Sequence, residues 1–296
     1  MIKDFFDKNN IDYYENASLK KYNTYRVDAT CSYLVFPENE KELIEILKKV
    51  NEEKIKYFVL GNGSNIILSM NYYDGVVIKL DKLNTISYNG NLVTAYSGCS
   101  LIKLSLDTIE KGLSGLEFAS AIPGSVGASV AMNAGAYNRD MSQVIKEVTV
   151  IDENYNITSL KNEEIEYSYR DSLLKKKPQM IVIKAIFELT DGDKEAMKKQ
   201  VEERRKKRIA SQPLEYPNAG SVFRNPENMY AGELIEKSNL KGYSIGGAEV
   251  SVKHANFIVN KGNATGKDII DLINKIQEEV NKNYQVKLKL EQIIIE

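Results

Sequence analysis

Residues 57–68 read Tyr-Phe-Val-Leu-Gly-Asn-Gly-Ser-Asn-Ile-Ile-Leu, which is an apolar run, a glycine loop and a second apolar run. Residues 57–60 predict a short buried strand that leads directly into the loop. The apolar residues 66–68 and the β-branched run at 76–80 predict further strands, not a helix. A P-loop would continue as Gly-Lys-Ser/Thr and a Rossmann fingerprint would open a helix, so the sequence excludes both motifs.

The glycine loop, residues 61–65, has two interpretations. Its backbone N–H groups can face a pyrophosphate, because glycine permits close approach and positive φ. A plain turn between two strands uses the same residue types. The loop alone leaves both interpretations open.

Helical periodicity surrounds this segment. The apolar positions in residues 41–50 repeat at helical spacing: Leu43, Ile44, Leu47 and Val50. A helix feeding the strand at 57–60 indicates an α/β unit. Farther along, Ser100 is a suitable cap for a helix that stops at Gly112.

The second half of the chain predicts both element types. Strands are expected at 148–151, 180–187 and 286–295. The charged run 193–208 predicts a solvated helix that leads to a domain boundary. Thr265 and Asp268 resemble a capping box before a helix with one apolar face over residues 269–280.

Composition limits the class of protein. The 296 residues are 43% hydrophobic and 27% charged, enough for two or three folding units with a sizeable core. The net charge of -1 provides no global field for nucleic acid or an anionic membrane. No signal-peptide pattern and no apolar run of about 20 residues occur, so we expect a cytoplasmic protein.

Cysteine and histidine are scarce. Cys31 and Cys99 form no CxxC motif, which argues against a zinc knuckle, a redox motif or a disulfide scaffold and predicts buried small side chains. His254 is the one histidine, so a His-rich metal site is excluded and no metal is expected. Proton chemistry must fall mostly to other side chains.

Four segments carry candidate site residues, each with a structural alternative. Residues 115–137 are dense in small residues, which suits a flat ligand or tight helix packing equally. Arg170 stands among hydroxyls and can bind a carboxylate or phosphate, or form a surface ion pair. Ser221 lies on a glycine turn, where it can bond its own backbone. Glu291 interrupts an apolar run and can face solvent by alternation.

These segments, in this order, resemble the UDP-N-acetylenolpyruvoylglucosamine reductase family over nearly the whole chain. The matching stretches are 23–26, 60–65, 115–137, 169–172, 219–226, 240–242, 246–248, 253–257 and Glu291. The resemblance implies an α+β fold with a two-part FAD-binding region of the vanillyl-alcohol-oxidase-like (PCMH) type and a C-terminal α/β substrate-binding domain. The implied domains are 1–80, to which residues 286–296 return, 81–200 and 210–285.

The resemblance also implies the reaction. Noncovalent FAD would carry a hydride from NADPH to UDP-N-acetylglucosamine enolpyruvate and yield UDP-N-acetylmuramate for peptidoglycan synthesis. Arg170 and Glu291 would stabilise the developing negative charge, and Ser221 would protonate carbon. The implied FAD contacts are Gly61, Asn62, Gly63, Ser64, Asn65, Gly115, Ile122, Pro123, Gly124, Ser125 and Gly127. The implied substrate contacts are Tyr137, Asn225, Lys253 and His254.

The chain departs from the family at some positions. Ser211 stands where lysine is frequent, and Gln292-Ile293 replaces Val-Arg after the glutamate, which removes a cation near the flavin. Only 70 positions separate Ser221 from Glu291, so the chain resembles the subclass without an extra substrate-covering loop. Two other functions stay open: an oxidase of the same FAD-binding superfamily, and a nucleic-acid-binding protein that uses the basic run 204–208.

Overall fold

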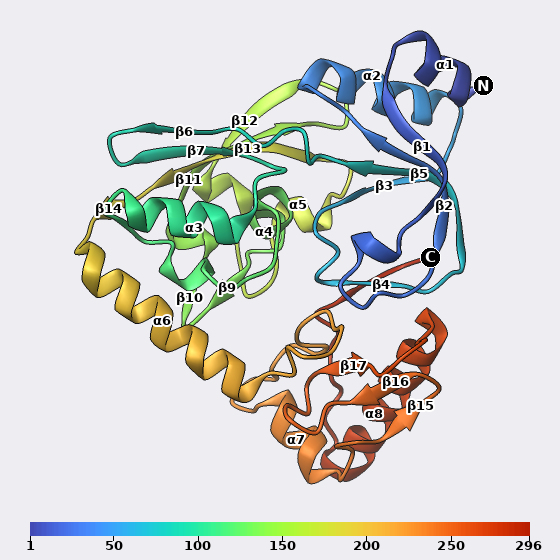
Figure 1. Ribbon diagram of the computed structural model, residues 1–296, viewed down its shortest axis with the longest axis vertical. Helices are drawn as coiled ribbons and strands as arrows, with labels where there is room; N and C mark the ends of the chain where they lie inside the picture. Colours follow the sequence, from blue (N-terminus) through green and yellow to red (C-terminus); the bar gives the residue numbers. More distant parts are fainter. The chain divides into compact units, whose positions relative to one another are not determined.

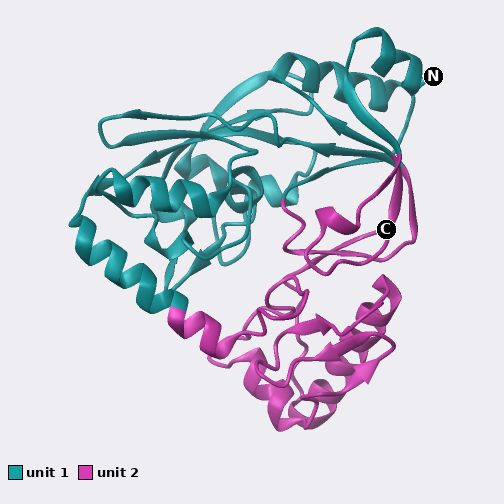
Figure 2. Ribbon diagram, viewed as in Figure 1, with its two compact units in different colours: residues 1–15, 33–61, 75–205 teal, residues 16–32, 62–74, 206–296 magenta.

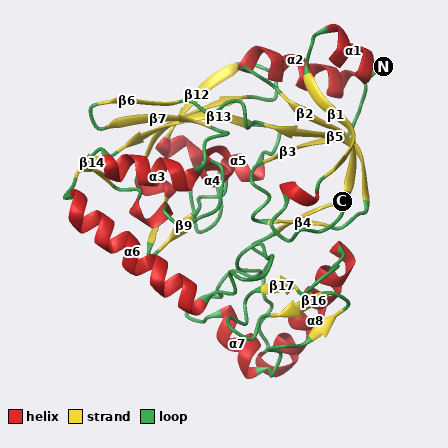
Figure 3. Cartoon of the chain, viewed as in Figure 1, coloured by secondary structure: helices red, strands yellow, loops and turns green.

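The computed structural model describes residues 1–296 and mixes helices with strands (Figures 1 and 3). The α-helices are α1 (Ile2–Lys8), α2 (Glu40–Glu52), α3 (Leu101–Glu110), α4 (Val126–Ala131), α5 (Leu173–Lys176), α6 (Lys194–Ser211), α7 (Ala231–Lys237) and α8 (Gly266–Tyr284). Short 3-10 helices occupy Lys20–Tyr22, Glu117–Ala119, Met141–Gln143 and Asn162–Ile165. No helix combines the length and the apolar character needed to cross a membrane.

The strands of the first half are β1 (Asp12–Ser18), β2 (Thr30–Phe36), β3 (Tyr57–Leu60), β4 (Ile66–Leu68), β5 (Tyr72–Lys79), β6 (Ile86–Asn89), β7 (Leu92–Tyr96), β8 (Leu113–Ser114), β9 (Gly135–Ala136), β10 (Arg139–Asp140) and β11 (Ile145–Ile151). Those of the second half are β12 (Ile157–Lys161), β13 (Ile181–Glu188), β14 (Thr190–Asp191), β15 (Ser244–Ile245), β16 (Ala248–Val250), β17 (Ile258–Asn260) and β18 (Ile293–Ile295).

The chain divides into two compact units (Figure 2). Unit 1 comprises residues 1–15, 33–61 and 75–205, and unit 2 comprises residues 16–32, 62–74 and 206–296. Because the chain passes between the units several times, the division falls inside β1, β2, β5 and α6.

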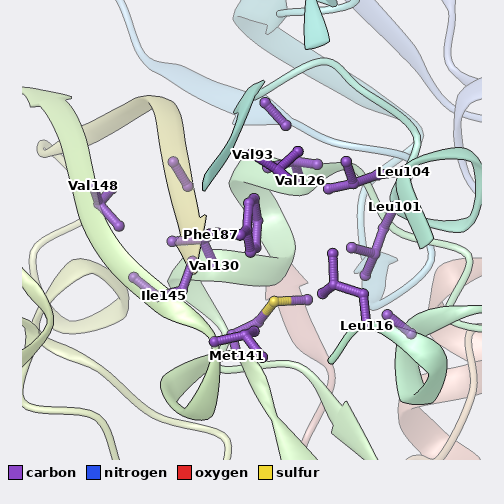
Figure 4. Close-up of a cluster of buried hydrophobic side chains, with 14 of the residues drawn as sticks. Val93, Leu101, Leu104, Leu116, Val126, Val130, Met141, Ile145, Val148 and Phe187 are labelled. Atoms are coloured by element: carbon purple, nitrogen blue, oxygen red, sulfur yellow. The ribbon is translucent and has the colours of Figure 1, made fainter. Parts of the chain in front are cut away.

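A five-stranded sheet in the order β12-β11-β13-β7-β6 dominates unit 1. Its neighbouring strands are antiparallel, and one face is covered by α3 and α4 (Figure 1). Figure 4 shows the core between sheet and helices, where Leu101, Leu104, Val130 and Phe187 are fully buried. Alternating apolar residues on the strands and a periodic apolar face on α3 produce this core.

A second core of unit 1 forms around α2 and the parallel pair β3–β5. Helix α2 begins at Asn39, whose side chain accepts a hydrogen bond from the Glu42 N–H, and it buries Leu43, Ile46, Leu47 and Val50. Strand β3 pairs with β5 in the register Tyr57↔Val76 to Leu60↔Lys79. The predicted helix and both predicted strands are therefore confirmed.

Unit 2 contains the antiparallel sheet β15-β16-β17 and the parallel pair β4–β18. Helix α8 begins with the predicted capping box, since the Thr265 side chain accepts from the Asp268 N–H and the Asp268 carboxylate accepts from the Thr265 N–H. The predicted apolar face of α8 is buried: Ile269, Leu272, Ile273, Ile276 and Val280. A strand, not a helix, follows the glycine loop, as expected.

Two further helices agree with the sequence. The Ser100 side chain caps α3 by accepting from the Lys103 N–H, and Gly112 follows the helix with φ +74°. Helix α6 buries only Met197, and its Lys194 and Lys198 ammonium groups lie 3.1 and 2.9 Å from the Glu110 carboxylate. The charged run is thus a solvated helical face, as predicted.

The final strand is shorter than predicted. Instead of spanning 286–295, it covers only Ile293–Ile295, which pairs with β4. Before it, residues 289–291 make single backbone bonds to the turn 222–224, with Arg224 N–H donating to the Lys289 carbonyl over 2.9 Å. The segment before β18 is extended and so keeps the apolar alternation of a strand. Its hydrogen-bond partner is the irregular turn 222–224 instead of a neighbouring strand.

Candidate active site

The glycine loop begins against the small-residue segment in unit 1. A Cβ added at Gly61 would lie 2.7 Å from the Ser125 Oγ and 2.9 Å from the Ala128 Cβ. These groups are separated by more than 60 residues of sequence, yet only a residue without a side chain permits their contact. The structure therefore brings two of the predicted cofactor segments together at Gly61 and Ser125.

Backbone hydrogen bonds fix the small-residue segment. The Leu101 N–H donates to the Gly124 carbonyl over 3.0 Å, and the Gly127 N–H donates to the Ser97 carbonyl over 3.0 Å. At Gly127 a Cβ would lie 2.5 Å from the Ser97 Oγ, so this glycine serves tight packing. Gly124 and Ser125 are buried, whereas Ile122 is half-buried and Pro123 is exposed.

Gly115 opens the same segment in an unusual conformation. Its φ is +136°, and its N–H donates to the carboxylate of the buried Glu117 over 3.0 Å. The Ser114 hydroxyl donates to the same carboxylate over 2.6 Å. Glu117 thereby holds the turn from which the segment starts.

Lys79 supports the glycine loop, although the sequence analysis assigned it no role. Its ammonium donates to the Gly61 carbonyl over 2.7 Å and lies 3.0 Å from the Asp81 carboxylate, while the residue is only 3% exposed. A buried lysine is stable only with such partners. Its position in an otherwise apolar strand was the signal that could have identified it.

The remainder of the loop belongs to unit 2. Gly63 has φ +63° and packs against the backbone of Tyr22 and Asn23, so a side chain is excluded there. The Thr24 N–H donates to the Gly63 carbonyl over 3.0 Å. Asn62 is exposed, and Ser64 and Asn65 are half-buried.

Arg170 occupies a tight turn in unit 1. Its φ of +55° is left-handed, and its guanidinium donates to the carbonyls of Asn133 and Gly135. The Asn133 side chain in turn donates to the Ser168 carbonyl over 2.9 Å and accepts from the Ser142 N–H over 3.0 Å. The turn with the expected catalytic arginine is thus fastened to the small-residue segment.

Tyr137 lies two residues beyond the carbonyl of Gly135. It has φ +56°, its ring is 46% exposed, and its hydroxyl donates to the Arg204 carbonyl over 3.4 Å. The Arg204 guanidinium lies 4.6 Å from the ring centroid, a cation–π arrangement. Arg170 and Tyr137 therefore share one segment of unit 1.

Ser221 follows Gly220, whose φ of +76° sets the turn in unit 2. After the serine, the Val222 N–H donates to the Asn256 carbonyl over 2.9 Å and the Phe223 N–H donates to the Asn256 Oδ1 over 3.0 Å. The Asn256 side chain also donates to the Phe223 carbonyl over 2.8 Å. This buried asparagine, which the sequence analysis left without a role, fixes the backbone beyond Ser221.

Glu291 lies on the segment that adjoins the Ser221 loop. Its N–H donates to the Val222 carbonyl over 2.9 Å, and its carbonyl accepts from the Asn65 side chain over 3.2 Å. Glu291 is half-buried, so it is not a freely solvated residue of an edge strand. Unit 2 thereby joins Ser221, Glu291 and the end of the glycine loop.

The expected substrate contacts of unit 2 have partners of their own. The Asn225 Oδ1 accepts from the Ala231 N–H over 3.1 Å and so fixes the start of α7. The Lys253 ammonium donates to the Ile209 carbonyl over 2.7 Å and lies 3.6 Å from the Glu215 carboxylate. The half-buried His254 packs edge-on against Phe257, and burial lowers its pKa.

Comparisons with known proteins place this arrangement in a family. Residues 212–295 match the family described as UDP-N-acetylenolpyruvoylglucosamine reductase, C-terminal domain, and residues 31–160 match the FAD binding domain family. A UDP-N-acetylenolpyruvoylglucosamine reductase of Clostridium perfringens (strain SM101 / Type A) is 45% identical over 295 residues, 100% of this chain and 96% of the relative. The reductase of Caldanaerobacter subterraneus subsp. tengcongensis is 43% identical over 275 residues, 93% of this chain and 91% of the relative.

Solved structures agree. The UDP-N-acetylenolpyruvylglucosamine reductase of Thermus caldophilus matches with a TM-score of 0.82 and 31% identity, over 97% of this chain and 99% of that chain. A glucooligosaccharide oxidase of Acremonium strictum matches with a TM-score of 0.53 and 13% identity, over 98% of this chain and 59% of that chain, which shows the fold alone. The expected fold class, an FAD-binding region with a C-terminal domain, is confirmed. The chain belongs to the UDP-N-acetylenolpyruvoylglucosamine reductase family.

Proposed function

We propose that this chain is an FAD-dependent oxidoreductase that reduces UDP-N-acetylglucosamine enolpyruvate to UDP-N-acetylmuramate in peptidoglycan precursor synthesis, with NADPH as hydride donor. Family membership over nearly the whole length supports the reaction. The observation that carries the residue roles is the direct backbone bond from Glu291 to Val222, beside Ser221.

The residues of this chain fit the cofactor. Gly61 lies against the small side chains of Ser125 and Ala128, so two predicted FAD segments meet where no large side chain stands, which suits close approach of a pyrophosphate and a flat ring. Gly61, Asn62, Gly63, Ser64 and Asn65 would hold the pyrophosphate. Gly115, Ile122, Pro123, Gly124, Ser125 and Gly127 would line the flavin.

Attachment of the flavin would be noncovalent. Both thiols are buried, and burial raises the pKa of Cys31 to about 11 and also raises the pKa of Cys99. A thiol held in its neutral form is a poor nucleophile. When bound, FAD supplies the hydride that reaches the terminal methylene carbon of the substrate.

Side chains of the protein would stabilise the negative charge that hydride addition creates on the substrate. Negative charge develops on the carbon next to the new methyl group and spreads into the substrate carboxylate. Arg170, whose two terminal nitrogens are already oriented by the carbonyls of Asn133 and Gly135, provides the cation. Glu291, which must be protonated to act as a donor, would donate a hydrogen bond to the same charge.

Ser221 completes the reaction by protonating that carbon. A hydroxyl is a weak acid at neutral pH, but a carbanion is a strong enough base to accept its proton when the two are aligned. Backbone bonds immediately beyond Ser221 support such alignment. No step needs an imidazole, which agrees with a single histidine.

Further parts of the proposal concern binding and location. Tyr137, Asn225, Lys253 and His254 would contact the UDP-sugar, and the enzyme would act in the cytoplasm. The three-part division into residues 1–80 with 286–296, 81–200 and 210–285 also stays a prediction, and the two compact units have different boundaries.

Visible absorbance of the purified protein tests the reaction. We expect a flavin band that bleaches with anaerobic NADPH and returns when UDP-N-acetylglucosamine enolpyruvate is added. Acid denaturation should release the flavin into the supernatant, since the attachment is noncovalent.

Other outcomes would contradict specific parts. A colourless protein that cannot be reconstituted with FAD would overturn the flavoenzyme proposal and favour a binding protein. Recovery of the band with oxygen alone, and none with the enolpyruvyl substrate, would favour an oxidase.

A further inference from the structure

The Gln292 side chain forms a buried junction in unit 2. Gln292 is 4% exposed, and its Nε2 donates to the carbonyls of Ala219 and Gly220 over 3.1 and 3.3 Å. Its Oε1 accepts from the Tyr25 hydroxyl over 3.0 Å. One side chain therefore connects three segments: the segment directly before β18, the Ser221 loop and the turn around Tyr25.

The groups around Gln292 suit a side-chain amide, which provides two N–H donors and an acceptor at any pH. Two carbonyls require donors, and a hydroxyl requires an acceptor. Tyr25 is 1% exposed, and burial raises the pKa of its phenol, which keeps the hydroxyl protonated as a donor. The Tyr25 carbonyl accepts from the Asn260 side chain over 2.8 Å, so Tyr25 is itself fixed.

These bonds act on the residues directly before Ser221. Gly220 has φ +76°, the position that a Cβ would take is open, and the Gly220 N–H donates to the Asn218 Oδ1 over 3.0 Å, so hydrogen bonds hold the backbone of this residue. Asn256 fixes the backbone directly after Ser221. With Gln292 on one side and Asn256 on the other, the remaining freedom at Ser221 is largely rotation of its side chain.

We propose that Gln292 is a positioning residue, which acts by orienting the Ser221 hydroxyl for proton delivery. The inference rests on the proposed function of Ser221 and adds a residue that does not touch the reacting atoms. Its effect is therefore confined to the step that needs the serine.

Two variants separate the donor function from side-chain size. Gln292→Met keeps the length but removes every hydrogen bond, and Gln292→Glu keeps the acceptor for Tyr25 but loses the donors to Ala219 and Gly220. We expect product formation from substrate in a single turnover to slow by about 10- to 100-fold in both, because small displacements of a catalytic group cost that much. Flavin reduction by NADPH should stay within about twofold, since it does not use Ser221.

The pH profile of Gln292→Glu gives a signature that a purely structural role lacks. A carboxyl group beside two carbonyl oxygens can donate once it is protonated. Product formation by Gln292→Glu should therefore recover toward the parental rate as the pH falls, whereas Gln292→Met should show no recovery. Tyr25→Phe should have a smaller effect, because both donors to the loop remain.

A matched control is Gln277→Met, which removes a bond of the same type, from the Gln277 Nε2 to the Leu288 carbonyl over 2.9 Å, that does not involve residues 219–221. Its product formation should equal that of the parent. Amide hydrogen exchange provides a readout besides activity: peptides covering residues 218–224 should exchange faster in Gln292→Met and not in Gln277→Met.

The Ser221→Ala background separates failure of this inference from failure of the proposed function. If Gln292 acts through the serine, Gln292→Met adds no further loss to Ser221→Ala. Parental activity of Ser221→Ala would refute the role of the serine itself. Strong impairment of Ser221→Ala with parental product formation by Gln292→Met would overturn only the inference. Loss of flavin or of flavin reduction in both glutamine variants would assign a structural role and overturn it as well.

Discussion

The two turns that carry the proposed catalytic residues Arg170 and Ser221 differ in how far along the sequence their hydrogen-bond partners lie. The Arg170 turn of unit 1 is held by residues 35 to 41 positions away, through Asn133, Gly135 and Ala131. The Ser221 loop of unit 2 is tied through Gln292, 72 positions away, to Tyr25, which lies 267 positions from that glutamine. The Arg170 turn is therefore held by hydrogen bonds to one segment near it in sequence, and the Ser221 loop is held by hydrogen bonds to distant parts of the chain.

In both turns, the hydrogen bonds of an asparagine side-chain amide take the place of the backbone hydrogen bonds that a helix or sheet would provide. Asn133 and Asn256 each make two side-chain hydrogen bonds to backbone, and each fixes a turn that no long strand supports. An irregular turn can therefore be as defined as a sheet when its carbonyl and N–H groups have fixed partners.

The largest expected effect concerns the Ser221 loop. Ser221→Ala should lower kcat by about 1,000-fold, within the range for loss of a proton donor. Flavin reduction by NADPH should be unchanged, because the reductive half-reaction does not need this hydroxyl. Stopped-flow measurement of both half-reactions checks the prediction, and an equal loss in both would mean that the loop acts in flavin binding.

Exchanging each asparagine for leucine compares the two turns directly. Asn256→Leu should cost about 2.5 kcal/mol of unfolding free energy for two lost buried hydrogen bonds. Asn133→Leu should cost about 4 kcal/mol, because Asn133 also has φ +46°, which leucine adopts at an added cost of about 1–2 kcal/mol.

Urea unfolding of both variants measures these values. Equal losses would mean that the left-handed backbone at Asn133 carries no strain penalty, and the comparison between the turns would then rest on hydrogen bonds alone.

A smaller effect is expected at the Arg170 turn. Arg170→Lys keeps the charge but cannot bond the carbonyls of Asn133 and Gly135 in the same planar geometry, so kcat should fall by about 30-fold, or about 2 kcal/mol. Steady-state kinetics measure the change. Lys176→Met, on the exposed side of the next helix, should be silent, and an equal loss there would point to general disruption of the turn.

The smallest effect is a pH dependence of unit 2. Burial lowers the pKa of His254 below its ordinary value of 6.5. The unfolded chain then binds the proton more readily than the folded chain. The contribution of His254 to the free energy of unfolding is therefore fully present above about pH 6.5 and is lost as the pH falls below it. His254→Gln should flatten the decline between pH 7.5 and 5.5 in urea titrations. An unchanged slope would assign the pH dependence to carboxylates instead.

Much of this architecture could be predicted from local sequence signals. Ser100, Thr265 with Asp268, and the apolar periodicity of residues 41–50 each identified a helix, because caps and amphipathic faces are encoded locally. The strand after the glycine loop was also predicted, which excluded a Rossmann fingerprint. Family resemblance supplied Arg170, Ser221 and Glu291, and their catalytic roles stay predictions.

The residues that sequence reasoning missed act through distant partners. Gln292 was noted only as part of the Gln292-Ile293 pair that replaces Val-Arg, yet its amide links Tyr25 to the Ser221 loop. Lys79 was counted as part of a strand, and nothing in its neighbourhood reveals the Gly61 carbonyl that it bonds. The final strand was predicted too long, since extended backbone and apolar alternation do not reveal whether a partner strand exists.

The pairing of β4 with β18 also has a consequence during biosynthesis. Residues 65–68 are translated 226 positions before residues 291–295, which supply their only parallel neighbour. At about 5–20 residues per second, the ribosome needs roughly 10–45 s to provide that neighbour. Ile67 and Leu68, which are fully buried in the folded protein, lack this neighbouring strand for that interval, so this part of unit 2 can complete its fold only after residues 291–295 have been made.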